Sequence, residues 1–311
     1  MKKDEKINWN LIIRWAGTFL SIAILYYLFR QIGAEETWAA VKKISLWRAA
    51  AVLGLVFVSR LATWGRWHTL LQVQSLRVRW QDSLRLTFAG LFASNVLPTT
   101  IGGDVVRLAG AVRLGIDTAL AAASLVADRL VGMTGMALAL PFAIPAVRIY
   151  LKAKSATGAS AGLALPAFFP GLMQKLQRAL KKVLDNFGFW LRHPLILARA
   201  LGFTFIHMLA TFLIVQILVE GMGESISLDR IAGLWSLTYF ISLIPISING
   251  LGLQELTITN LFSALGGLQP STSITLAVIL RVVWMIGSLP GAFVLGGIIG
   301  GNKDPKSEME C

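Results

Sequence analysis

Long apolar runs separated by short polar segments dominate the chain. A helix needs about twenty apolar residues to cross the roughly 30 Å hydrocarbon core of a bilayer. The fourth run is weak, because it is rich in glycine and alanine and carries two prolines. The runs predict six spanning helices at about residues 11–29, 46–71, 118–147, 156–173, 195–219 and 273–297. We therefore expect an all-α polytopic membrane protein with a single integral membrane domain over residues 1–311.

Two further apolar segments are interrupted and do not form clean spans. The first breaks at residues 97–104 and the second at 245–252, each through a proline and paired glycines. Proline removes a backbone donor, and glycine weakens a helix. Broken backbone at membrane depth persists only where it is buried in protein or lines a wet cavity. We expect two re-entrant or discontinuous helical elements.

The two broken elements occupy corresponding positions in two halves of the chain, about 10–147 and 195–300. The weak span and a basic amphipathic helix at 173–192, expected on the cytoplasmic surface, join the halves. If all the predicted spans cross the membrane, the first broken element enters from the cytoplasmic face and the second from the external face. Paired interrupted segments of this kind are typical of transporters with an inverted repeat and a central site.

Composition and charge support the membrane interpretation. Charged residues make up 14% of the chain, against about 25% in soluble domains. The net charge is +13, and arginines dominate the loop after the second span, where the basic residues are Arg66, Arg77, Arg79 and Arg85. The positive-inside rule places this loop and both termini in the cytoplasm. No zinc-finger, helix-turn-helix or RNA-binding pattern accompanies the charge, so we expect no nucleic-acid partner.

Cysteine and histidine usage limits the chemistry further. The chain has one cysteine, Cys311, and three scattered histidines. An intrachain disulfide is excluded, and we expect no metal site and no cofactor. Residues 158–162 match the nucleophile-elbow pattern, and His207 lies in the fifth span. The elbow needs a strand–turn–helix context, so a hydrolase is disfavoured.

Charged side chains within apolar segments are the candidate site. Asp104 and Arg107 are three residues apart and share a helical face. A charge in the bilayer core costs about 2.5–3.5 kcal/mol on insertion scales, so such groups face a cavity or a partner. Internal salt bridging is the structural alternative, and it applies most to Arg60 and Arg281. The candidate substrate-binding residues are Asn95, Pro98, Gly102, Gly103, Asp104, Arg107, Asp128, Arg129, Asn249, Gly250, Gly252 and Glu255.

Four stretches carry a family resemblance: 94–98, 103–107, 127–130 and 245–255. With them the chain resembles the lysylphosphatidylglycerol synthase transmembrane (flippase-like) family over about residues 10–300. The resemblance implies a bacterial or archaeal cytoplasmic-membrane protein that moves or handles lipids. The lysyl-transferring soluble domain of two-domain members is missing from this chain, so we expect no synthase activity.

These observations lead to two functional hypotheses. The first is a flippase-like transporter of an anionic phospholipid or a polyprenyl-phosphate lipid, with Arg107 and Arg129 on phosphate. Asp104, Asp128 and Glu255 would contact an aminoacyl or sugar group, or carry protons. The second is a membrane enzyme or accessory subunit in polyprenyl-phosphate glycan or lipid modification. A second copy of the chain, or a separate lipid-modifying enzyme, is the expected protein partner.

Overall fold

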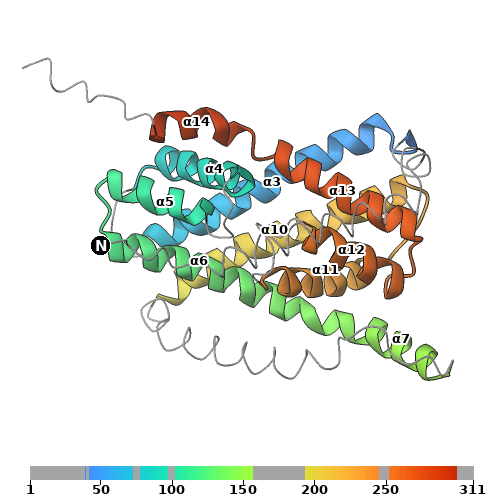
Figure 1. Ribbon diagram of the computed structural model, residues 1–311. Helices are drawn as coiled ribbons and strands as arrows, with labels where there is room; N and C mark the ends of the chain where they lie inside the picture. Colours follow the sequence, from blue (N-terminus) through green and yellow to red (C-terminus); the bar gives the residue numbers. More distant parts are fainter. Residues whose placement is uncertain are drawn as a thin grey trace, which may run out of the picture.

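The computed structural model describes residues 39, 42–72, 78–96, 102–156, 193–244 and 252–299, and every element in this part of the chain is helical (Figure 1). In chain order the elements are α3 (Leu46–Leu71), α4 (Trp80–Val96), α5 (Gly102–Arg113), α6 (Thr118–Ala139), the 3₁₀ helix η2 (Leu140–Ala143), α7 (Ile144–Ala156), α10 (Pro194–Gly221), α11 (Leu228–Ser242), α12 (Leu253–Ala264), α13 (Pro270–Ile286) and α14 (Pro290–Ile299).

The helical, multi-pass character of the chain is confirmed. Four helical stretches of the described residues are long and apolar enough to cross a membrane, namely Leu46–Leu71, Thr118–Leu151, Pro194–Gly221 and Pro270–Val294. They coincide with the predicted second, third, fifth and sixth spans. The predicted first and fourth spans, the amphipathic helix at 173–192 and the centres of both breaks lie outside the described residues.

The predicted sixth span contains a short turn, at residues 287–289, between α13 and α14. Pro290 has no N–H to donate to the carbonyl of Ile286, so α13 ends at Ile286 and α14 starts at Pro290. The Ser288 N–H bonds to the carbonyl of Met285. The carbonyl of Trp284 instead accepts a hydrogen bond from Arg60 Nη2 at 3.0 Å. Arg60 thus satisfies a backbone group at the end of α13.

Two helical hairpins flank the breaks. Helices α4 and α5 pack together in the left half of Figure 1, and α11 and α12 pack together in the right half. Helix α6 contacts α5 of the first pair and α11 of the second, whereas α3 packs on α4 and α10 packs on α11. Gly103 permits the close approach of α5 to α4, because a Cβ there would lie 2.3 Å from the carbonyl oxygen of Gly90.

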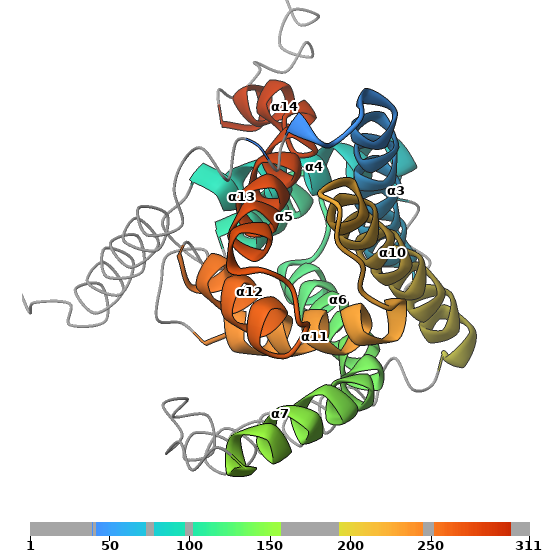
Figure 2. The same ribbon diagram turned by 90° about the vertical axis from the view of Figure 1, so that its right-hand side faces the viewer.

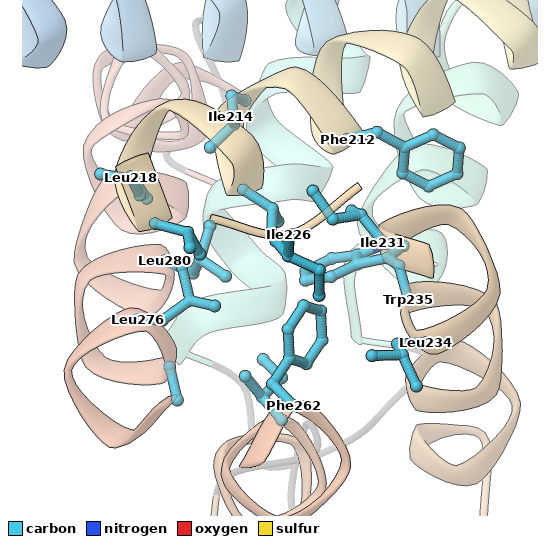
Figure 3. Packing of buried hydrophobic residues seen from close by; sticks show 14 of the residues in the cluster. Phe212, Ile214, Leu218, Ile226, Ile231, Leu234, Trp235, Phe262, Leu276 and Leu280 are labelled. Carbon is cyan, nitrogen blue, oxygen red and sulfur yellow. The ribbon is translucent and has the colours of Figure 1, made fainter. Parts of the chain in front are cut away.

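The largest apolar core lies among α10, α11, α12 and α13 (Figure 3). Side chains such as Leu218, Ile231, Phe262 and Leu276 are almost completely buried there. Lipid chains are as apolar as leucine, so van der Waals packing holds this core together. Helix α11 packs on α12 and also contacts α6 (Figure 2). Met136 of α6 belongs to this core and also lines the polar cavity described next.

Candidate functional site

A polar cavity of about 200 Å³ lies where six helices meet. Helices α3, α4, α5, α6, α10 and α11 all contribute side chains, so the cavity draws on both halves of the chain. Its lining residues are Thr63, Arg66, Thr87, Gly90, Leu91, Ser94, Gly103, Asp104, Arg107, Asp128, Arg129, Gly132, Met136, Thr204, His207 and Tyr239.

Asp128 on α6 is the most deeply buried charge of the cavity. Its Oδ1 accepts a hydrogen bond from Arg66 Nε at 2.6 Å, and its Oδ2 accepts one from Arg107 Nη1 at 3.2 Å. The Asp128 side chain is only 4% exposed. Both of its carboxylate oxygens therefore have a cationic partner, which a carboxylate needs when it is removed from water.

Asp104 on α5 extends the same network toward the surface of the molecule. It lies 3.5 Å from Arg107 Nη1, and its Oδ2 lies 2.6 Å from Arg129 Nη2. The Asp104 side chain is 21% exposed and that of Arg129 is 41% exposed. The result is one chain of ions, Arg66–Asp128–Arg107–Asp104–Arg129, which joins α3, α6 and α5. Three arginines against two aspartates leave one positive charge in excess among these residues.

Arg107, the central cation, is incompletely hydrogen-bonded. Its Nε and Nη2 are buried and have no hydrogen-bond partner among the described residues. Its guanidinium carbon lies 4.1 Å from the ring centre of Trp67, which supplies a cation–π contact. Gly90 leaves room for its stem, because a Cβ there would approach the Arg107 Cγ to 2.7 Å. Trp67 of α3 and Gly90 of α4 therefore together create the buried position of Arg107.

Hydroxyl groups form most of the remaining polar lining. Each donates its hydrogen to the carbonyl four residues earlier in its own helix, over 2.8–3.0 Å; these groups belong to Thr63, Thr87, Ser94 and Thr204. A hydroxyl oxygen used in this way keeps lone pairs that accept hydrogen bonds. The cavity therefore offers acceptors from α3, α4 and α10 beside the cations of the ion network.

His207 and Tyr239 bring two further polar rings to the cavity. The Nδ1 of His207 is 2.7 Å from Ser59 Oγ, a contact that fixes the ring against α3. Tyr239 is the contribution of α11, and therefore of the second hairpin, to the lining.

Glu255 is not among the described residues that line this cavity. Its Oε2 accepts the N–H of Gly252 at 2.8 Å, and its Oε1 is paired with Arg281 Nε. Gly252 is the N-cap of α12, with φ at +76°, a backbone conformation that suits glycine. Glu255 thus caps α12 and joins it to α13. This arrangement agrees with the alternative in which the Glu255–Arg281 pair is an internal salt bridge.

The other predicted site residues have varied positions. Asn95 donates from Nδ2 to Ser288 Oγ at 2.7 Å and so joins α4 to the turn before α14. Gly102 is buried at the start of α5, and Gly103 lines the cavity. Pro98, Asn249 and Gly250 lie outside the described residues, as do residues 158–162 of the elbow-like pattern.

The sequence interpretation missed Arg66, which it assigned to a cytoplasmic loop. The structure places Arg66 inside α3, 11% exposed and bonded to Asp128. A signal was available, because Ser59, Thr63 and Arg66 recur at helical spacing and form one polar face in an apolar run.

Comparison with known proteins agrees with this architecture. The family model described as the lysylphosphatidylglycerol synthase TM region matches residues 14–291. A UPF0104 membrane protein from Archaeoglobus fulgidus is 28% identical over 126 residues, or 40% of this chain; the match covers 38% of that relative's length. The family match spans most of the chain and includes every residue of the ion network. This multi-pass helical membrane protein belongs to the lysylphosphatidylglycerol synthase transmembrane region family.

Proposed function

We propose that this protein is a flippase-like transporter, which moves the anionic headgroup of a membrane lipid through the polar cavity. The observation that carries the proposal is the five-residue ion network, which joins two helices long and apolar enough to span a membrane, α3 and α6, to the short helix α5 and has one positive charge in excess. A phosphodiester carries one negative charge and would neutralise that excess.

The energetics favour a functional role for the network over a purely structural one. Each charge at the bilayer centre costs about 2.5–3.5 kcal/mol on insertion scales. Well-packed apolar side chains in place of a buried ion pair are often equally or more stable. Five charges around a cavity are thus a poor way to hold three helices together. They are a suitable way to receive a charged headgroup that must leave water.

The graded exposure of the network suggests how a headgroup would enter. Exposure increases from Asp128 through Asp104 to Arg129. A phosphate arriving at Arg129 would compete with Asp104 for the guanidinium, which binds both oxyanions in a planar fork. Asp104, once released, would accept hydrogen bonds from an ammonium or hydroxyl group of the same headgroup. Arg107 lies behind Asp104 and would attract the phosphate inward.

A reconstitution experiment tests this function. Purified protein in proteoliposomes receives acyl-labelled fluorescent phosphatidylglycerol, and dithionite quenching measures how fast the probe changes leaflet. Asp104→Asn should slow the movement about tenfold, a barrier increase of about 1.4 kcal/mol. The matched control is Asp229→Asn, at an exposed carboxylate outside the cavity. Chemical analysis of the recovered lipid separates transport, which leaves it unchanged, from enzymatic modification.

Two outcomes would contradict the proposal. If wild-type protein moves neither phosphatidylglycerol nor a polyprenyl-phosphate probe, the transport function is wrong. If the lipid moves equally fast in wild type and Asp104→Asn, transport occurs by a route other than the cavity.

A further inference from the structure

A second hollow lies beside the end of α6, the turn η2, the start of α7 and α11. It has a volume of about 340 Å³ and is bordered by Ala137, Leu140, Ile144, Val147 and Leu237, with Arg148 as the charged residue of its lining. We call it the apolar groove. It follows the point where α6 changes into the 3₁₀ turn η2 at Pro141 and continues as α7.

The apolar groove arises from the kink in this long helix. Pro141 cannot donate a backbone hydrogen bond, and residues Leu140–Ala143 form a tighter 3₁₀ turn between α6 and α7. Helix α11 approaches the kink very closely at Gly233, where a Cβ would lie 2.3 Å from the backbone nitrogen of Ala143. Beside this close contact, η2 and α7 line the groove on one side and Leu237 of α11 lines it on the other.

The apolar groove and the polar cavity share two walls. On α6, Met136 lines the cavity and Ala137 lines the groove. On α11, Tyr239 lines the cavity and Leu237 lines the groove. Across this seam, Ser236 Oγ approaches Met136 Sδ at 3.9 Å, a weak contact in comparison with the ion pairs of the network.

The spacing of the two hollows suits a single lipid molecule. From Arg129 to Ala137 along α6 is eight residues, or roughly 12 Å at 1.5 Å per residue. The hydrocarbon of one leaflet is roughly 15 Å thick, half of the 30 Å core. A lipid with its phosphate beside Arg129 would therefore have the end of its chain at the depth of Ala137, the near end of the groove.

We propose that the apolar groove holds a hydrocarbon chain of the lipid whose headgroup occupies the polar cavity, and that this chain passes between α6 and α11. This inference rests on the proposed function. The chemistry of the lining supports a hydrocarbon occupant, because the groove offers almost no hydrogen-bonding group and lies in the membrane-spanning stretch Thr118–Leu151. Arg148, at the α7 end, is exposed, and its charged end can extend toward the headgroup level.

Photolabelling tests the proposal. Full-length protein in nanodiscs is irradiated with phosphatidylglycerol that carries a diazirine near the end of one acyl chain, and peptide mass spectrometry locates the label. We expect labelling of the α6–η2–α7 stretch and of α11 at Leu237. Ala137→Trp, which fills the groove, should reduce this labelling about tenfold, equivalent to about 1.4 kcal/mol of binding. Leu138→Trp is the matched control, since Leu138 is the next residue, 58% exposed and outside the groove lining.

A substitution in the polar cavity tests whether one lipid fills both hollows or a separate lipid fills each. If the same lipid occupies both hollows, Arg129→Gln should reduce chain labelling in the groove together with transport. Unchanged labelling in Arg129→Gln would indicate an independent lipid and overturn the inference, as would labelling equal in Ala137→Trp and Leu138→Trp. Wild-type transport is measured separately in proteoliposomes, so a failure of the groove assignment is not confused with a failure of the proposed function.

Discussion

Arg66 and Asp128, 62 residues apart in sequence, are joined by a 2.6 Å hydrogen bond between Arg66 Nε and Asp128 Oδ1. The bond links α3 to α6 at the buried end of the ion network. Gly132, one turn after Asp128, leaves space for the guanidinium, because a Cβ there would lie 2.9 Å from Arg66 Nη1. The pair anchors a network whose other end, at Arg129, is accessible.

Neutralising Asp128 should destabilise the protein more than neutralising Asp104. Asp128→Asn leaves two buried arginines, Arg66 and Arg107, without their shared carboxylate, and breaking a buried pair costs about 3–5 kcal/mol. Asp104→Asn affects a more exposed pair and should cost clearly less. Thermal unfolding in detergent, followed by circular dichroism, measures both. Equal stability of the two variants would contradict the buried position of the Arg66–Asp128 pair.

The closeness of α4 and α5 gives a second prediction. Gly103→Ala should destabilise the protein by about 1–3 kcal/mol, because the new methyl would lie 2.3 Å from the carbonyl oxygen of Gly90 and the backbone must move. Gly54→Ala in α3 is the matched control, since a Cβ there meets nothing within 4 Å. That variant should be neutral or more stable by up to about 1 kcal/mol. If both variants lost stability, the loss would come from replacing a glycine within a helix and not from the α4–α5 contact.

The spans were predictable from the sequence because the bilayer requires long apolar helices. The predicted bounds of α3, 46–71, agree with those in the structure. The interruption between α13 and α14 was missed, although Pro290 marked it, because the apolar run continues through the turn.

The site residues were predictable as types but not as partners. The i, i+3 spacing of Asp104 and Arg107 is local, and the structure brings these two side chains together. Glu255 was identified as an intramembrane acid, but its partner Arg281 lies on another helix, and no local pattern indicates which helices touch. Arg66 was missed because it lies near the end of α3, where arginine usually indicates a cytoplasmic loop.

The Glu255–Arg281 pair should be structural. Glu255→Gln keeps an acceptor for the Gly252 N–H but loses the ion pair, so Arg281 stays partly buried beside a neutral amide. We expect a lower unfolding temperature, with partial recovery in the double variant Glu255→Gln/Arg281→Met, because the partly buried cation that has lost its carboxylate is then removed. Thermal unfolding of the two single variants and the double variant measures the coupling. Full stability of Glu255→Gln together with lost lipid movement would instead restore a direct substrate role for Glu255.

The excess positive charge of the cavity should determine which lipids move. Arg129→Gln changes the balance of the network from one positive charge to zero, and because the Arg129 side chain is 41% exposed, its loss should affect stability little. The rate for fluorescent phosphatidylglycerol should decrease about tenfold, whereas the rate for a zwitterionic phosphatidylcholine probe, if it moves at all, should change less.

The matched control for this charge change is Arg85→Gln, at an exposed arginine of α4 that does not line the cavity. Both variants remove one positive charge from the protein, so a general effect on binding to anionic membranes would slow them equally. A selective loss in Arg129→Gln would locate the effect at the ion network. Equal slowing, or equal effects on both lipid probes, would show that the cavity charge does not select the headgroup.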